Sequence, residues 1–125
     1  MDEIENSDKK FQKELAAGIS ALVLLSVLNR TAKPMYGYQI AKIIDGQREG
    51  LSMLKQGTLY PVLRSLEDGK LLESQVEPSV SGPPRRYYRI TDSGRLAFAR
   101  WKTTWSAMTQ FVDDILKEDS NDQQR

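Results

Sequence analysis

The side chains that could do chemistry in this chain are carboxylates, lysines, arginines and tyrosines, because its 125 residues include no cysteine and no histidine. This composition excludes thiolate nucleophiles, disulfide scaffolds, Cys/His zinc sites and catalytic triads built on histidine. The acidic pairs Glu67–Asp68 and Asp113–Asp114 are adjacent in sequence, so their side chains diverge on a helix and cannot share one site. The sequence also has no glycine-rich phosphate loop and no metal-ligand spacing. We therefore expect a protein that is not an enzyme and that uses no cofactor and no metal.

The net charge of +1 is unevenly distributed along the chain. Residues 29–95 carry a net charge of +4, whereas residues 1–28 carry −2 and residues 96–125 carry −1. The basic centre indicates which part of the chain would meet a polyanion such as DNA.

The elements that must position these charges can be predicted from apolar spacing and capping residues. Residues 1–7 are expected to form a flexible acidic arm, followed by a helix over residues 8–30 with Ser7 as its N-cap. The segment Ala21–Leu28 is apolar on nearly all sides, which predicts burial from two directions. The longest apolar run, Ala16–Leu28, has 13 residues and is too short to cross a bilayer. We therefore expect no membrane association.

Two shorter helices are predicted next. One spans residues 36–47 and carries apolar residues at helical spacing. The other is expected to begin at Thr58 as N-cap, with Pro61 in its first turn, and to end near Asp68 at Gly69.

An alternating pattern predicts two strands over residues 71–77 and 85–91, joined by a turn rich in serine, glycine and proline. Leu72, Val76, Tyr88 and Ile90 are expected on the inner face of this hairpin. A long helix over residues 92–117 and a flexible tail over residues 118–125 complete the chain. The element order predicts an α+β fold that is mainly α. It consists of a winged helix-turn-helix over residues 8–91, with three helices and a two-stranded β-hairpin wing, followed by a long C-terminal helix.

Three sequence motifs together resemble the PadR family of bacterial transcription regulators. They are YGYQI (residues 36–40), QGTLYPVLRSLEDGKL (residues 56–71) and RYYRITDSG (residues 86–94). The resemblance covers residues from about 19 to 115 and is closest to the short-tailed subgroup, which has a single C-terminal helix. It implies a homodimeric, repressor-like, sequence-specific DNA-binding protein of the bacterial cytosol, associated with the nucleoid, with the third helix in the DNA major groove.

Several polar residues lie outside the apolar stripe of the third helix and are candidates for DNA contact. Gln56 suits adenine, and Arg64 suits guanine or a phosphate. Tyr60 either contacts the sugar–phosphate backbone or packs under the hairpin. The hairpin arginines either reach a flanking groove or, for Arg85 and Arg86, pair with acidic residues of the neighbouring strand. The residues expected to contact DNA are Tyr36, Tyr38, Lys55, Gln56, Thr58, Tyr60, Pro61, Arg64, Arg85, Arg86 and Arg89. The two tyrosines of the first motif resemble the backbone-clamping tyrosines of the family, although at least one of them could belong to the core.

The last helix carries an apolar seam at the 3-4 spacing of a coiled coil, larger than one small domain can cover. With the first helix it predicts a dimer, whose two-fold axis would set two recognition helices about 34 Å apart on a palindromic operator. The residues expected at the dimer interface are Leu22, Leu25, Phe98, Trp101, Trp105, Met108, Val112 and Ile115.

Trp101 and Trp105 allow two interpretations. Multidrug-sensing members of the family bind planar aromatic compounds between tryptophans, which implies an effector pocket here, whereas large aromatic side chains also simply fill dimer cores. An alternative function for the whole chain is a winged-helix protein–protein interaction module without DNA binding, which the near-neutral total charge keeps open.

Overall fold

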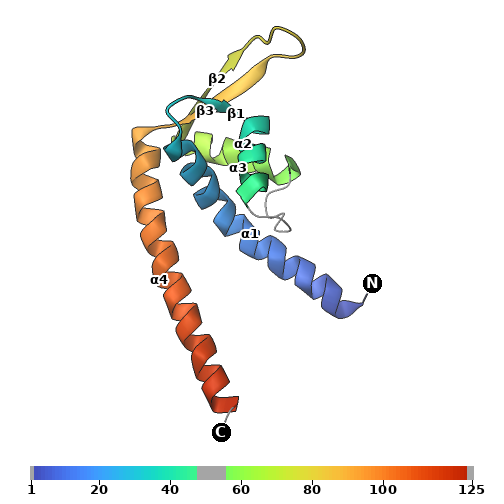
Figure 1. Cartoon of the computed structure of the whole chain (residues 1–125), viewed down its shortest axis with the longest axis vertical. Coiled ribbons are helices and arrows are strands. Elements are labelled where there is room, and N and C mark those ends of the chain that lie inside the picture. The colour runs from blue at the N-terminus through green and yellow to red at the C-terminus, as the bar shows by residue number, and fades with distance from the viewer. Residues whose placement is uncertain (1, 48–55, 124–125) are drawn as a thin grey trace.

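The structure is a computed structural model that describes residues 2–47 and 56–123. Within these residues the elements are α1 (Glu3–Arg30), β1 (Met35–Tyr36), α2 (Gly37–Gln47), α3 (Gln56–Asp68), β2 (Leu72–Glu77), β3 (Arg85–Ile90) and α4 (Asp92–Gln123). The strands form an antiparallel sheet in the order β1-β3-β2. The predicted fold class is confirmed, with one additional strand in the wing (Figure 1).

Helix α1 begins earlier than the sequence predicted. The carboxylate of Asp2 accepts a hydrogen bond from the Glu5 amide at 2.8 Å, and Glu3 and Glu5 lie in the first turn, where acidic side chains favour the positive end of the helix dipole. The predicted helix start after Ser7 is therefore wrong, and residues 3–7 are helical. Helix α4 likewise continues beyond its predicted end at residue 117, so residues 118–123 are helical and do not belong to a flexible tail.

The core lies where α1, α2, α3 and the sheet meet. Its fully buried side chains are Leu24, Leu25, Leu28, Ile40, Leu59, Leu63 and Leu72. Tyr88 and Ile90 of β3 close it from the sheet side, as predicted. Val76 was expected on the same inner face but is 49% exposed, because the hairpin projects beyond the helices (Figure 1).

Strand β1 was missed because two residues give no periodicity to read. Met35 and Tyr36 pair with Tyr88 and Tyr87 of β3, a contact between segments far apart in sequence. The backbone N–H of Tyr36 also donates to Oε1 of Gln39 at 3.1 Å, which is half of a capping box at the start of α2.

Helix α3 ends at Asp68 as predicted but differs from expectation in its start and in the residue that terminates it. It begins at Gln56, so Thr58 is not its N-cap, and Pro61 lies inside it. At the C-terminus, Leu71 N–H donates to Leu66 C=O and Lys70 N–H donates to Glu67 C=O, both at 2.9 Å. This is a Schellman motif with Lys70, at φ 66°, in the left-handed position that Gly69 was expected to serve.

Helices α1 and α4 extend away from the winged domain in diverging directions (Figure 1). By length and composition α1 is long and apolar enough to cross a membrane, because one window of it has a mean hydropathy of 1.5. The 13-residue apolar run therefore underestimated the length of the apolar part of this helix. One third of that window is buried within the chain, and its leucines form the core described above. We interpret α1 as the core helix of the domain, because a buried core helix meets the same criteria of length and composition as a membrane span.

Candidate nucleic-acid interface

Helix α3 buries one face and exposes the other. Leu59, Leu63 and Leu66 pack into the core, as the spacing predicted. The exposed residues on the opposite side are Thr58, Tyr60, Pro61, Arg64 and Ser65. Two predicted contact positions cannot be placed, since Lys55 and the side chain of Gln56 lie outside the part of the chain that the structure describes.

Tyr60 links α3 to the start of α2. Gly37 is buried, and a Cβ atom added there would come within 2.7 Å of the Tyr60 ring, so a larger residue at position 37 would displace that ring. Tyr60 therefore packs against the first turn of α2, while 46% of its surface stays exposed. This position leaves part of the ring available to a ligand on the α3 face.

Aromatic and cationic side chains form a second group at the base of the wing, which we call the wing-base cluster: Tyr36, Tyr38, Lys42, Arg85 and Tyr87. The rings of Tyr36 and Tyr38 stack with centroids 6.4 Å apart, and Tyr87 meets Tyr36 edge-on at 5.4 Å. The guanidinium of Arg85 lies 4.4 Å from the Tyr36 centroid, and the ammonium of Lys42 lies 5.1 Å from the Tyr38 centroid. These cation–π contacts hold positive charge over flat rings at the surface.

Neither tyrosine of the first motif belongs to the core, since Tyr36 is half-buried and Tyr38 is exposed. Lys42 was missed by sequence reasoning. Its position four residues after Tyr38 on α2 is the signal that could have found it.

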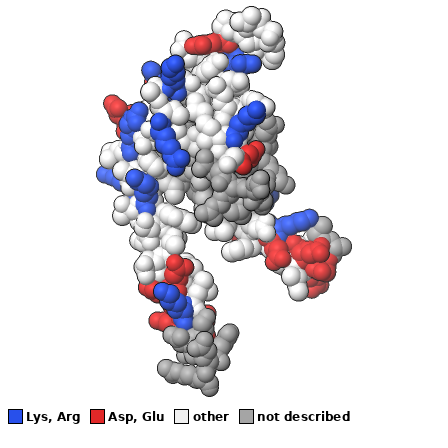
Figure 2. Space-filling view, viewed as in Figure 1, with Lys and Arg blue, Asp and Glu red and all other residues white. Residues whose placement is uncertain are grey.

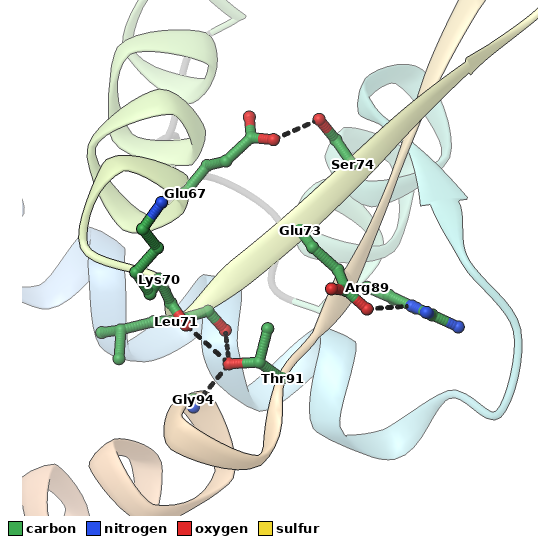
Figure 3. A network of polar contacts seen from close by, with 8 residues as sticks. All are labelled: Glu67, Lys70, Leu71, Glu73, Ser74, Arg89, Thr91 and Gly94. Atoms are coloured by element: carbon green, nitrogen blue, oxygen red, sulfur yellow. Dashed lines mark hydrogen bonds and ion pairs between the residues drawn. The ribbon is translucent and has the colours of Figure 1, made fainter.

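The other two wing arginines take polar partners from strand β2. Arg86 donates to the Ser74 hydroxyl at 2.9 Å, and Ser74 in turn donates to the Glu67 carboxylate at the end of α3. Arg89 forms an ion pair with Glu73, so Glu73 pairs with neither Arg85 nor Arg86 (Figure 3). Arg86 is thereby linked to α3 through Ser74. The positive charge of Arg89 is partly balanced by the carboxylate of Glu73.

Charge is separated along the molecule. Figure 2 shows Lys and Arg gathered over the winged part, and Asp and Glu towards the free ends of α1 and α4. Inside the winged part, burial raises the pKa of the Tyr88 phenol above its usual value of 10.0, so this side chain is neutral at physiological pH. Among the described residues no group of three or more His, Cys, Asp or Glu side chains could hold a metal ion.

Comparison with known proteins identifies the family to which this winged fold belongs. The model of the Transcriptional regulator PadR-like family matches residues 24–100, which include α2, α3, the sheet and the first turns of α4. This chain belongs to the PadR-like family. As a member of that family it is a transcriptional regulator and not an enzyme.

Solved structures of transcriptional regulators resemble this chain over most of its length. A PadR family regulator from Eggerthella lenta is 30% identical, with a TM-score of 0.75 over 90% of this chain and 95% of that one. A transcriptional regulator from Clostridium thermocellum is 26% identical, with a TM-score of 0.72 over 81% of this chain and 96% of that one. An uncharacterized protein of Lysinibacillus sphaericus is 27% identical over 76% of this chain and 84% of its own length.

The apolar seam on α4 of this PadR-like chain is exposed in its C-terminal part. Trp105, Met108, Val112 and Ile115 keep large exposed surfaces, as do Phe111 and Leu116 beside them. Phe98 and Trp101 pack in part against the chain's own core.

On α1, Leu25 has no exposed surface, so it belongs to that core and cannot face a partner, contrary to expectation. Leu22 is half-buried. A polar cavity lies between the end of α1, the sheet and the start of α4, with Arg89, Thr91 and Arg95 in its wall and neither tryptophan lining it.

Proposed function

We propose that this chain is a sequence-specific DNA-binding regulator, a dimeric repressor of the bacterial cytosol that is released by a small molecule or a stress signal. The observation that carries the proposal is the joint placement of the exposed face of α3 and the wing-base cluster. The two surfaces come from separate parts of the sequence and are linked through Tyr60, which packs on the first turn of α2.

The exposed face of α3 has the chemistry that a major groove requires. Arg64 can donate two hydrogen bonds to guanine. Thr58 lies six residues earlier, in the N-terminal part of α3, which is the part of a recognition helix that contacts base edges in helix-turn-helix proteins. The acidic side chain of Glu67 is occupied by Ser74 at the other end of the helix. This contact directs the Glu67 carboxylate towards strand β2, at the end of α3 farther from Thr58.

The wing-base cluster suits the DNA backbone. Its exposed tyrosine can donate a hydrogen bond to a phosphate, while Arg85 and Lys42 add positive charge. Because Arg85 rests on the Tyr36 ring, less side-chain entropy is lost when it contacts DNA.

Two copies of the chain would place two such surfaces on one operator. The exposed seam on α4 is the surface that a second copy would cover, since contiguous apolar side chains of this kind mark protein interfaces. Two-fold symmetry would pair the recognition helices about one helical turn of DNA apart.

The test is the binding of the purified chain to DNA fragments from the region upstream of its own gene. Fluorescence anisotropy measures this binding at salt concentrations between 50 and 200 mM. We expect affinity to fall steeply with salt. Arg64→Ala should weaken binding to the preferred sequence by about 1–3 kcal/mol and binding to unrelated sequences much less. Arg100→Ala, at an exposed arginine on α4, is the matched control and should change neither. Negligible DNA binding at low salt would instead favour a protein–protein interaction module.

Release by an effector has its own test. We propose that Trp101 and Trp105 line a pocket for planar aromatic compounds in the dimer. Planar cationic dyes should then quench tryptophan fluorescence in the native chain and fail to do so in Trp101→Ala. Unchanged fluorescence across a broad panel of dyes would show that these rings only fill the interface.

A further inference from the structure

The turn that ends α3 lies against the beginning of α4 and is held there by hydrogen bonds. The Schellman motif fixes Lys70 in the left-handed region and directs two consecutive carbonyl groups, those of Lys70 and Leu71, towards Thr91. Carbonyl groups just past a helix end are commonly satisfied by water or by local caps. Here a residue 20 positions away satisfies them.

Thr91 joins the two helices through its backbone N–H and its hydroxyl group (Figure 3). Its backbone N–H donates to Leu71 C=O at 3.1 Å. Its hydroxyl oxygen lies 2.8 Å from Lys70 C=O and 3.1 Å from Leu71 C=O, so one hydroxyl proton is shared between the two carbonyls. The same oxygen accepts the Gly94 N–H at 3.0 Å and so caps the first turn of α4.

Gly94 makes this approach sterically feasible. It is buried, and a Cβ atom added there would overlap the Leu71 carbonyl oxygen and lie 2.6 Å from Cγ1 of Ile90. One turn of α4 thus rests directly on the backbone that ends α3, with no side chain between them. Arg95 adds a contact from the same turn of α4 to the end of α1, where it donates to the Asn29 side chain at 3.0 Å.

We propose that Thr91 and Gly94 are positioning residues that lock the end of α3 to the start of α4, so that dimer pairing through α4 sets the distance between the two recognition helices. The inference rests on the proposed function, because it assigns the spacing of DNA half-sites to this lock. Neither residue touches DNA in this scheme. Both act through the orientation of α3 relative to α4.

The lock itself can be measured without DNA. The chain has no cysteine, so Ser65→Cys and Gln110→Cys place spin labels at one exposed position on α3 and one on α4. Labelled and unlabelled chains are mixed to isolate the distance within one chain. We expect a single narrow distance distribution in the native background and a broadened or displaced one in Thr91→Val and in Gly94→Ala.

Two control variants separate the lock from general stability. Thr91→Ser keeps the hydroxyl and should restore the narrow distribution. Thr103→Val removes a threonine hydroxyl that donates to its own helix and should leave the distribution unchanged. Unaltered distances in both Thr91→Val and Gly94→Ala would overturn the proposal.

The consequence for DNA is tested by selecting binding sites from a random library with each variant. The native chain and Thr91→Ser should select one half-site sequence at one spacing. Thr91→Val and Gly94→Ala should select the same half-site sequence but lose the spacing preference, because the exposed face of α3 is unchanged. Variants that select the native spacing would contradict the role of the lock. A native chain that selects no paired half-sites would overturn the proposed function and the spacing role together, while the distance measurement would still judge the lock.

Discussion

The hydroxyl of Ser74 lies between two charged side chains of opposite sign, at the point where the wing meets α3. It donates to Glu67 and accepts from Arg86, so it connects charges that do not contact each other directly. The bond to Glu67 is partly buried and therefore stronger than an exposed one, since water competes less well for its partners, whereas the bond from Arg86 is exposed.

Ser74→Ala should therefore lower the free energy of unfolding by about 1 kcal/mol, the net value of a hydrogen bond with charged partners in a partly exposed site. Urea denaturation followed by circular dichroism measures this change. Ser106→Ala, at an exposed serine of α4, is the control and should not lower the midpoint, because alanine favours the helix over serine. An unchanged midpoint for Ser74→Ala would mean that water replaces the hydroxyl at no cost.

Tyr88 makes stability depend on alkaline pH. Burial raises the pKa of its phenol in the folded chain, so the unfolded chain releases the proton first, near pH 10. The contribution of the neutral phenol is fully present below pH 10 and is lost as the pH rises towards the folded-state value. The free energy of unfolding should fall above about pH 10 in the native chain and fall less in Tyr88→Phe. Identical curves for the native chain and Tyr88→Phe would assign the loss to other groups.

At the scale of elements, the end of α3 shows why a correct helix boundary can hide a wrong mechanism. The sequence predicts the stop near Asp68 because a glycine follows, yet Lys70 takes the left-handed conformation. Lysine pays a steric cost there that glycine does not. The Thr91 contact with both carbonyls is one reason the turn holds this shape.

Lys70→Gly should therefore raise the free energy of unfolding by about 0.5–1 kcal/mol, after the extra entropy of glycine in the unfolded chain is subtracted. Lys102→Gly makes the same exchange in the middle of α4 and should cost about 1 kcal/mol. Thermal denaturation of the two variants measures opposite shifts. A loss of stability in Lys70→Gly would show that its side chain contributes more than its backbone conformation costs.

The elements that the sequence predicts well are those with long apolar periodicity, such as α1, the buried face of α3 and the two strands of the hairpin. Those it misses depend on partners far along the chain. Strand β1 exists only through Tyr87 and Tyr88, and Gly94 is required because Leu71 and Ile90 lie against it. At the candidate site the same limit applies, since Arg85, Arg86 and Arg89 are equivalent in sequence but take three different partners.

For the whole molecule, the association of two chains depends on the C-terminal half of α4. This half extends away from the winged domain, and its apolar seam is exposed to solvent (Figure 1). Met108 lies at the centre of the seam and is 61% exposed in the single chain. If a second copy covers this position, a charge placed there would be buried without a partner, at a cost of several kcal/mol. Met108→Glu should therefore convert the dimer to a monomer.

Sedimentation velocity measures the mass, and DNA binding measures its consequence. The Met108→Glu monomer retains its own α3 face, so it should bind one half-site weakly and lose the cooperative affinity for the paired site. Thr103→Glu adds the same charge on the opposite side of α4 and should remain dimeric with native affinity. If Met108→Glu stays dimeric, the two chains associate through another surface, and the spacing of their recognition helices is not set by α4.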